Sequence, residues 1–276
     1  MKKISIRKMT CYSILLLIAL FSYSLCEPYW LIIKRVDIDD KDIPGSFDGT
    51  KIAFISDIHH GPFFSRNRVR SLVGKVNELD PDIVILGGDY VHRDPKYIAP
   101  CFDELKNLKA DTGKFGVLGN HDHWEGAALT RECMKKSEIT LIDNQAGWIR
   151  KGSEKIKIGG VGEFWEDAQD IYPTIHDVKE EDFVILVSHN PDFAEKISGH
   201  YIDLVLSGHT HGGQVTLFGL WAPLVPSAYG QKYRTGMVYT KFTNVLITNG
   251  VGTITPPVRF FARPEIVLIT LKHKQK

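Results

Sequence analysis

Histidine, aspartate and asparagine side chains recur in five short motifs that lie far apart along the chain. The motifs are Asp57-Ile58-His59, Gly87-Gly88-Asp89, Gly119-Asn120-His121-Asp122, Ser188-His189-Asn190 and Gly208-His209-Thr210-His211-Gly212-Gly213. Imidazole nitrogen combined with hard oxygen, without thiolate, is a donor set that suits Mn, Fe or Zn. The motifs therefore indicate a candidate metal site.

Each motif alone is a modest signal. An isolated aspartate in a turn, such as Asp89, is common, and His189 by itself is typical of a buried, hydrogen-bonded histidine. The double-histidine segment around His209 and His211 is stronger, because its glycines let the backbone approach a ligand closely. The occurrence of all five motifs in one chain favours a functional site over five unrelated coincidences.

The elements that position these motifs follow from the hydrophobic pattern. Short apolar, β-branched runs alternate with amphipathic stretches, which is typical of strands alternating with helices. Strands are predicted at 51–56, 82–87, 114–118, 182–188 and 203–207, helices at 65–80, 97–109, 124–136 and 190–197, and mostly strands and turns over 214–271. Every motif directly follows a predicted strand. The carboxyl ends of parallel strands share one edge of a sheet, where ligands bind in α/β folds.

The strand–helix alternation predicts a largely parallel sheet, and the strand-rich later part predicts a second sheet packed on it. The series of motifs resembles the calcineurin-like metallophosphoesterase superfamily over residues 51–213. Flanking segments resemble its membrane-associated YkuE/YaeI-type branch, namely His189-Asn190-Pro191-Asp192, Ser207 to Gln214, Tyr229-Gly230, Asn249-Gly250-Val251-Gly252 and Arg263-Pro264-Glu265. This resemblance implies an α/β fold, specifically a four-layer αββα sandwich of two mixed β-sheets flanked by helices.

The resemblance also implies two divalent metal ions (Mn, Fe or Zn) that share one carboxylate. The implied ligands are Asp57, His59 and His211 at the first site, Asn120, His189 and His209 at the second, and Asp89 bridging both. His121 would act over the bound phosphate as proton donor or charge stabiliser, oriented by Asp122. The implied reaction is attack of a metal-bridged hydroxide on a phosphodiester or pyrophosphate bond.

The N-terminal segment departs from the rest of the chain. Lys2, Lys3, Arg7 and Lys8 precede an apolar run from Cys11 to Cys26. This pattern is typical of a signal peptide or a signal anchor, and the poor cleavage signal before Glu27 favours an uncleaved anchor. The expected organisation is an anchor or signal segment at 1–26, a linker at 27–49 and a metallophosphoesterase domain at 50–276. The positive N-terminus predicts a catalytic domain outside the cytoplasm, at the cell membrane.

Three residues are candidate substrate contacts. His60 neighbours a motif residue, Trp221 belongs to the apolar stretch Leu217–Pro226, and Arg259 could contact phosphate. The apolar stretch predicts either a hydrophobic hairpin or a wall beside the metals that contacts lipid or an acyl chain. Cys101 and Cys133 could pair, or remain two buried thiols.

The formal net charge of +1 argues against a nucleic-acid-binding protein, which usually carries a basic excess. The expected substrate is a phosphate ester or pyrophosphate, which could be linked to a lipid. Two alternatives stay open. One is a lipid-precursor hydrolase resembling the UDP-2,3-diacylglucosamine pyrophosphohydrolases, and the other is a non-catalytic scaffold that keeps the fold without the reaction. The oligomeric state is not predicted.

Overall fold

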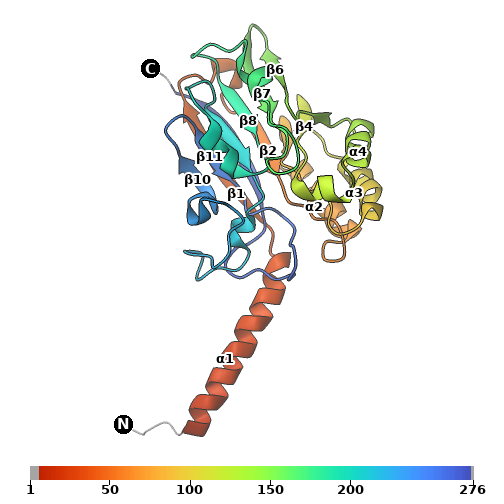
Figure 1. Ribbon diagram of the computed structural model, residues 1–276, viewed down its shortest axis with the longest axis vertical. Helices are drawn as coiled ribbons and strands as arrows, with labels where there is room; N and C mark the ends of the chain where they lie inside the picture. The colour runs from red at the N-terminus through yellow and green to blue at the C-terminus, as the bar shows by residue number, and fades with distance from the viewer. Residues whose placement is uncertain (1–5, 275–276) are drawn as a thin grey trace.

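A computed structural model describes residues 6–274, so Lys2 and Lys3 of the basic segment lie outside the described residues. One long helix, α1 (Ile6–Cys26), stands away from a compact domain that contains all the strands (Figure 1). This helix is long and apolar enough to cross a membrane, a property that signal sequences share. It continues directly into a 3₁₀ turn, η1 (Glu27–Tyr29), whose Glu27 and Pro28 are buried in the domain.

Two mixed six-stranded sheets form the centre of the domain. The first has the order β1 (Ile32–Asp40), β12 (Glu265–His273), β2 (Lys51–Ile55), β3 (Ile83–Leu86), β4 (Gly113–Gly116), β5 (Thr140–Leu141). The second has the order β10 (Gly236–Tyr239), β11 (Asn244–Ile247), β9 (Leu204–Ser207), β8 (Val184–Val187), β7 (Glu154–Gly160), β6 (Gln145–Lys151). Strands β2, β3, β4 and β5 run parallel, and so do β7, β8, β9 and β11.

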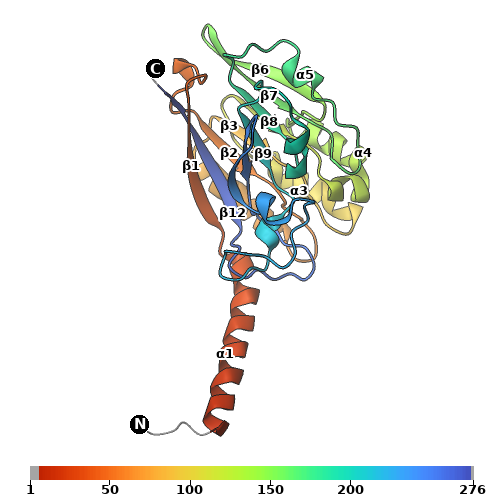
Figure 2. The same ribbon diagram turned by 60° about the vertical axis from the view of Figure 1, so that its left-hand side comes forward.

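The sheets pack face to face, because alternate residues of each strand point to opposite sides. Ile52 and Phe54 of β2 lie in the core between the sheets, together with Ile185 of β8. Ala53 and Ile55 face the other way, onto the helices that cover the first sheet. These helices are α2 (Arg66–Glu78), α3 (Ile98–Leu105) and α4 (Asn120–Lys136). The predicted sandwich of two mixed sheets flanked by helices is confirmed (Figure 2).

Short elements cover the outer face of the second sheet. They include α5 (Tyr172–Ile175) and the 3₁₀ turn η4 (Pro191–Lys196), and the remaining 3₁₀ turns are η2 (Gly45–Phe47), η3 (Pro95–Tyr97), η5 (His211–Gly213) and η6 (Gly230–Tyr233). The helix predicted at 190–197 is therefore a 3₁₀ segment, capped by the Asn190 side chain, which accepts a hydrogen bond from the Asp192 amide. Cys101 and Cys133 are free, buried thiols.

The predicted linker at 27–49 is wrong for its central part. Residues 32–40 form β1, which pairs in parallel with β12 over its whole length. Ile43 and Phe47, farther along the same segment, are fully buried in the core between the sheets. Segment 27–49 therefore belongs to the folded domain, and α1 connects to it without a flexible spacer.

Candidate metal centre

Tight turns follow the strands and carry most of the expected ligands. Five of these ligands have a left-handed backbone with φ between 48° and 67°, a conformation that costs a non-glycine residue about 1–2 kcal/mol. They are Asp57, His59, Asp89, His209 and His211. Such strain persists where surrounding structure imposes it, and it concentrates at functional sites. Here it turns each side chain into the space at the carboxyl edge of the two sheets.

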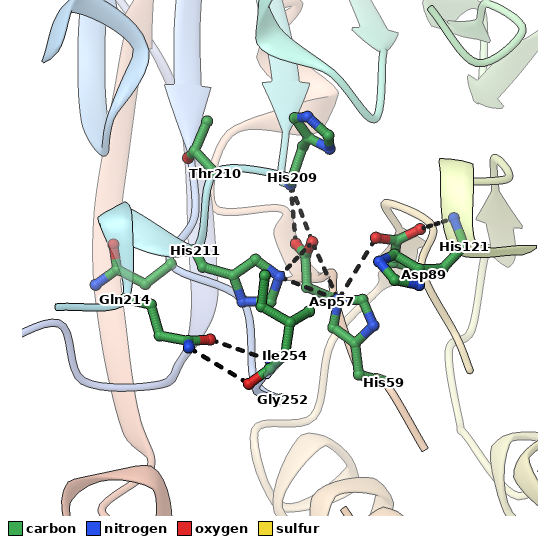
Figure 3. Close-up of polar contacts among 12 residues, drawn as sticks. Asp57, His59, Asp89, His121, His209, Thr210, His211, Gln214, Gly252 and Ile254 are labelled. Atoms are coloured by element: carbon green, nitrogen blue, oxygen red, sulfur yellow. Dashed lines mark hydrogen bonds and ion pairs between the residues drawn. The ribbon is translucent and has the colours of Figure 1, made fainter. Parts of the chain in front are cut away.

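The first group of donor atoms comes from the turns after β2 and β9 (Figure 3). The Nε2 atoms of His59 and His211 lie 3.0 Å apart. Asp57 Oδ1 lies 3.4 Å from Nε2 of His211 and 3.9 Å from Nε2 of His59. All three side chains are buried, and their donor atoms lie within 4.8 Å of one another, a separation at which one cation can be held.

The second group lies on the other side of Asp89. Nε2 of His189 is 3.3 Å from Asp89 Oδ2 and 3.3 Å from Nδ1 of His209. Nδ1 of His209 is in turn 3.1 Å from Oδ1 of Asn120. The same Oδ2 atom of Asp89 lies 3.5 Å from Nε2 of His59 in the first group. One carboxylate oxygen therefore stands between two sets of nitrogen and oxygen donors, an arrangement that fits a pair of cations.

Burial governs the charge state of these groups. It lowers the pKa of His59 and His211 well below the ordinary value, so both rings are neutral and carry a free lone pair near pH 7. Burial also raises the pKa of Asp57, to about 6. For Asp89 burial acts in the same direction, but the positive charge of His189 and its neighbours dominates and lowers its pKa well below the ordinary value. The neutral imidazoles of His59 and His211, beside buried carboxylates, offer the donor chemistry of divalent transition metals.

Hydrogen bonds from outside the cluster fix several of these side chains. Nδ1 of His189 pairs with the carbonyl oxygen of Gly87 at 2.7 Å, which orients the ring and leaves Nε2 for the cluster. The amide of His209 donates to both carboxylate oxygens of Asp57, at 3.0 and 3.1 Å. A Cβ atom on Gly208 would collide with this same carboxylate. The backbone of the double-histidine turn thus approaches Asp57 as closely as glycine permits.

Asp122 does not orient His121, contrary to the sequence-based expectation. Its buried carboxylate accepts hydrogen bonds from the amides of Asp89, Tyr90 and Gly119 at 2.8–2.9 Å. All three hydrogen bonds come from the backbone of two turns, so Asp122 holds the Asp89 turn against the start of α4.

His121 instead contacts a histidine that the motifs do not reveal. Nδ1 of His92 lies 3.3 Å from Nδ1 of His121, and the Trp124 ring packs edge-on against His121 at 4.7 Å. Burial, with the nearby His121, lowers the pKa of His92 to about 4, so that ring is neutral. Trp165, from the loop after β7, packs against His209 at 4.5 Å. Neither His92 nor Trp165 belongs to a recognisable spacing, and the one signal for His92 in the sequence is its closeness to the motif residue Asp89.

Two of the three candidate substrate contacts are engaged elsewhere. Arg259 is fully buried, and its guanidinium donates to the carbonyl oxygens of five residues, so it is a structural residue rather than a surface phosphate contact. These carbonyls belong to His211, Asn249, Gly250, Gly252 and Ala262. His60 is buried and pairs through Nδ1 with the Phe64 carbonyl at 2.7 Å. Trp221 is half exposed in the loop that follows His211.

Comparisons with known proteins agree with this geometry. Residues 50–213 match the model of the calcineurin-like phosphoesterase family. The chain is 33% identical to the uncharacterized metallophosphoesterase YkuE of Bacillus subtilis over 254 residues, covering 89% of this chain and 87% of the relative. It is 31% identical to the phosphodiesterase YaeI of Escherichia coli over 251 residues, covering 89% and 90%.

The fold is also found among solved structures. The NAD nucleotidase NadN of Haemophilus influenzae superposes with a TM-score of 0.52 at 15% sequence identity, over 73% of this chain and 50% of that one. At this identity the likeness concerns the fold alone. The family model covers more than half of the chain, and the YkuE and YaeI relatives align over nearly all of it. This chain therefore belongs to the calcineurin-like phosphoesterase family and is a metal-dependent phosphoric ester hydrolase.

Proposed function

We propose that this protein hydrolyses phosphodiester or pyrophosphate bonds with two divalent ions, and that its substrate is associated with the cell envelope. One observation carries the proposal. Oδ2 of Asp89 lies within 3.5 Å of Nε2 of both His59 and His189, so one carboxylate oxygen faces two separate donor groups. A single-ion site would not require this arrangement, whereas a bridged pair of ions does.

The proposed ligands form two sets that share Asp89. The first ion would be held by Asp57, His59 and His211, the second by Asn120, His189 and His209, and both by Asp89. When bound, the two ions supply Lewis acidity that activates an attacking water and offsets the charge of the phosphate. Mn, Fe and Zn all suit this mixture of nitrogen and oxygen donors.

His121 is the proposed proton donor or charge stabiliser at the phosphate. Its amide donates to Oδ1 of Asp89 at 2.9 Å, which ties its backbone to the proposed bridging residue. A protonated His121 can donate from Nδ1 to the neutral Nδ1 of His92, 3.3 Å away, and this leaves Nε2 for the substrate. His92 is thus a positioning residue for His121.

Helix α1 is the proposed membrane anchor. It presents an exposed apolar surface over nearly its whole length, and Arg7 and Lys8 lie at its N-terminal end. Positive charge before the first apolar segment favours a cytoplasmic N-terminus, which would put residues 27–276 outside the cytoplasm. A topology reporter fused after Lys276 tests this, since a cytoplasmic signal would instead favour the lipid-precursor hydrolase resembling UDP-2,3-diacylglucosamine pyrophosphohydrolases.

The catalytic proposal is tested with Asp89→Asn and His121→Ala, using bis-p-nitrophenyl phosphate and added Mn²⁺. Each substitution should lower turnover by about 100-fold or more, because general acid catalysis alone contributes about 10²–10⁴-fold. His176→Ala serves as the control, since His176 is exposed at the end of α5. Near wild-type rates in either site variant would refute the mechanism.

Metal analysis of the wild-type protein separates the enzyme from a scaffold that keeps the fold without the reaction. About two transition-metal ions per chain are expected after reconstitution, in line with a bridged pair. Fewer than one bound ion per chain would favour the scaffold.

A further inference from the structure

The proposed metal centre and the end of α1 lie at the same end of the domain. β1 begins directly after η1, and β12 runs parallel to it. β2 is antiparallel to β12, so β2 runs back toward α1 and ends, before Asp57, at the end of the sheet where α1 is attached. β3 and β4 are parallel to β2 and end at the same edge. The carboxyl edge that carries the site therefore faces the side from which α1 leaves (Figure 1).

The last turn of α1 is fixed against the domain. The Tyr23 ring contacts the rings of Phe260 and Phe261, at 5.4 and 5.2 Å. The carboxylate of Glu27 accepts hydrogen bonds from the amides of Phe261 and Ala262, each at 2.7 Å. The helix axis therefore has a set direction relative to the metal edge, and the domain cannot rotate freely about the anchor.

An apolar surface lies beside this attachment. We call it the apolar rim, and it consists of Leu217, Phe218, Leu220, Trp221, Leu224 and Phe261. These side chains are between 39% and 82% exposed. Phe218 contacts Phe261 at 5.4 Å, and Phe261 contacts Tyr23 of α1, so the rim is continuous with the helix. Residues 212–231 contain neither acidic nor basic side chains, so burying this loop removes no charge from water.

The length of α1 determines how close to the bilayer the apolar rim must lie. The 21 residues of Ile6–Cys26 span about 31 Å at 1.5 Å per residue. The hydrocarbon core of a bilayer is about 30 Å thick. Because Arg7 and Lys8 occupy the first turn, the apolar part is shorter than the core, and the helix must be immersed as far as Cys26. Tyr23 and the phenylalanines that touch it then lie at the level of the membrane interface, where aromatic residues concentrate.

We propose that the apolar rim inserts into the interface of the membrane that α1 crosses, so that the metal edge is held over the lipid headgroups and acts on phosphate esters of membrane-embedded molecules. This rests on the proposed anchor and on the proposed phosphoesterase reaction. A lipid surface is the occupant because the rim is contiguous with the only candidate membrane span among residues 6–274.

The first test measures insertion in the full-length protein, reconstituted into phosphatidylcholine–phosphatidylglycerol vesicles. Lipids with a doxyl quencher near the headgroup should quench the fluorescence of Trp221, obtained as the difference between wild type and Trp221→Phe. Leu220→Asp/Leu224→Asp should remove most of this quenching. Absence of quenching in the wild type would overturn the proposal, whether or not the enzyme is active.

The second test compares two diesters with the same leaving group. Hydrolysis of p-nitrophenyl hexadecyl phosphate in the vesicles should fall roughly tenfold in Leu220→Asp/Leu224→Asp, because charged residues weaken interfacial insertion. Hydrolysis of soluble bis-p-nitrophenyl phosphate should be unchanged. Tyr239→Asp is the matched control, since Tyr239 is 77% exposed but lies at the opposite end of the second sheet, next to the start of β11.

The outcomes separate the two proposals. A wild-type protein that is quenched but inactive on both diesters would refute the phosphoesterase reaction while supporting the docking. Equal loss on both diesters in the rim variant, or equal loss in Tyr239→Asp, would overturn the role of the rim in presenting lipid phosphates.

Discussion

Replacement of Arg259 by methionine should destabilise the protein severely rather than weaken substrate binding. The side chain is fully buried and donates six hydrogen bonds to five backbone carbonyls. Burial lowers its pKa only to about 10, so the guanidinium is charged at neutral pH. It joins the double-histidine turn of the site, at the carbonyl of His211, to the loops at 249–252 and 262.

The size of the effect follows from the shortest of these bonds. Three of them, to Asn249, Gly252 and Ala262, measure 2.6–2.7 Å. Hydrogen bonds to charged groups contribute about 1.5–3 kcal/mol each, which sums to about 4.5–9 kcal/mol. Relaxation and entry of water reduce this sum, so we expect Arg259→Met to lower the free energy of unfolding by about 5 kcal/mol, at the upper end for single substitutions. Arg259→Lys keeps the charge but loses the fork geometry, and should cost about half as much.

Urea unfolding of the metal-loaded protein, followed by circular dichroism, measures the difference. The exposed Arg150, replaced by methionine in β6, is the control and should change the free energy by less than about 0.5 kcal/mol. The reasoning would be refuted if Arg259→Met unfolded within about 1 kcal/mol of the wild type.

Two further predictions concern the site and the surface. Gly208→Ala should abolish most turnover and lower the metal content, because the added Cβ would displace the carboxylate of Asp57. The control is Gly74→Ala, in open space on α2, which should leave the stability of the protein unchanged or raise it by up to about 1 kcal/mol. Equal metal content in both variants would contradict this. Two arginines of α2 hold the pKa of Glu104 at about 2, below its ordinary 4.5, so its contribution is full above about pH 5 and is lost as the pH falls through about 2. Glu104→Gln should therefore cost about 1–2 kcal/mol at pH 7 and progressively less on acidification, as measured by urea unfolding; a pH-independent difference would exclude the ion pair as its cause.

The central strands were predictable because their signals are local. β2, β3, β8 and β9 are apolar runs apart from Lys51 and Ser207 at their ends, and each lies within one or two residues of its predicted range. α2 begins after Ser65 as its apolar spacing indicated. β1 was missed because its residues alternate between half-buried and exposed, and its partner β12 lies more than 200 residues farther along the chain. Such a pairing leaves little trace in the local pattern.

The site was predictable to the extent that strand ends converge. Side chains that directly follow parallel strands must meet at one edge, and the structure brings all seven expected ligands together there. His92 and Trp165 reach the site through the path of their loops, which no local spacing encodes. Arg259 was misjudged because an arginine beside two phenylalanines is usually exposed, and its burial depends on carbonyls from three separate segments, of which the one at His211 is distant in sequence.

The position of β12 between β1 and β2 has a consequence for how the protein is made. The first sheet cannot close until residues 265–273 have left the ribosome, because they supply the hydrogen-bonding partner of both early strands. Until then β1 and β2 each present an unpaired edge, the kind of edge that associates with other chains. The first sheet therefore closes late, and the domain has a high contact order. Loss of β12 should thus leave an aggregation-prone chain rather than a slightly shortened enzyme.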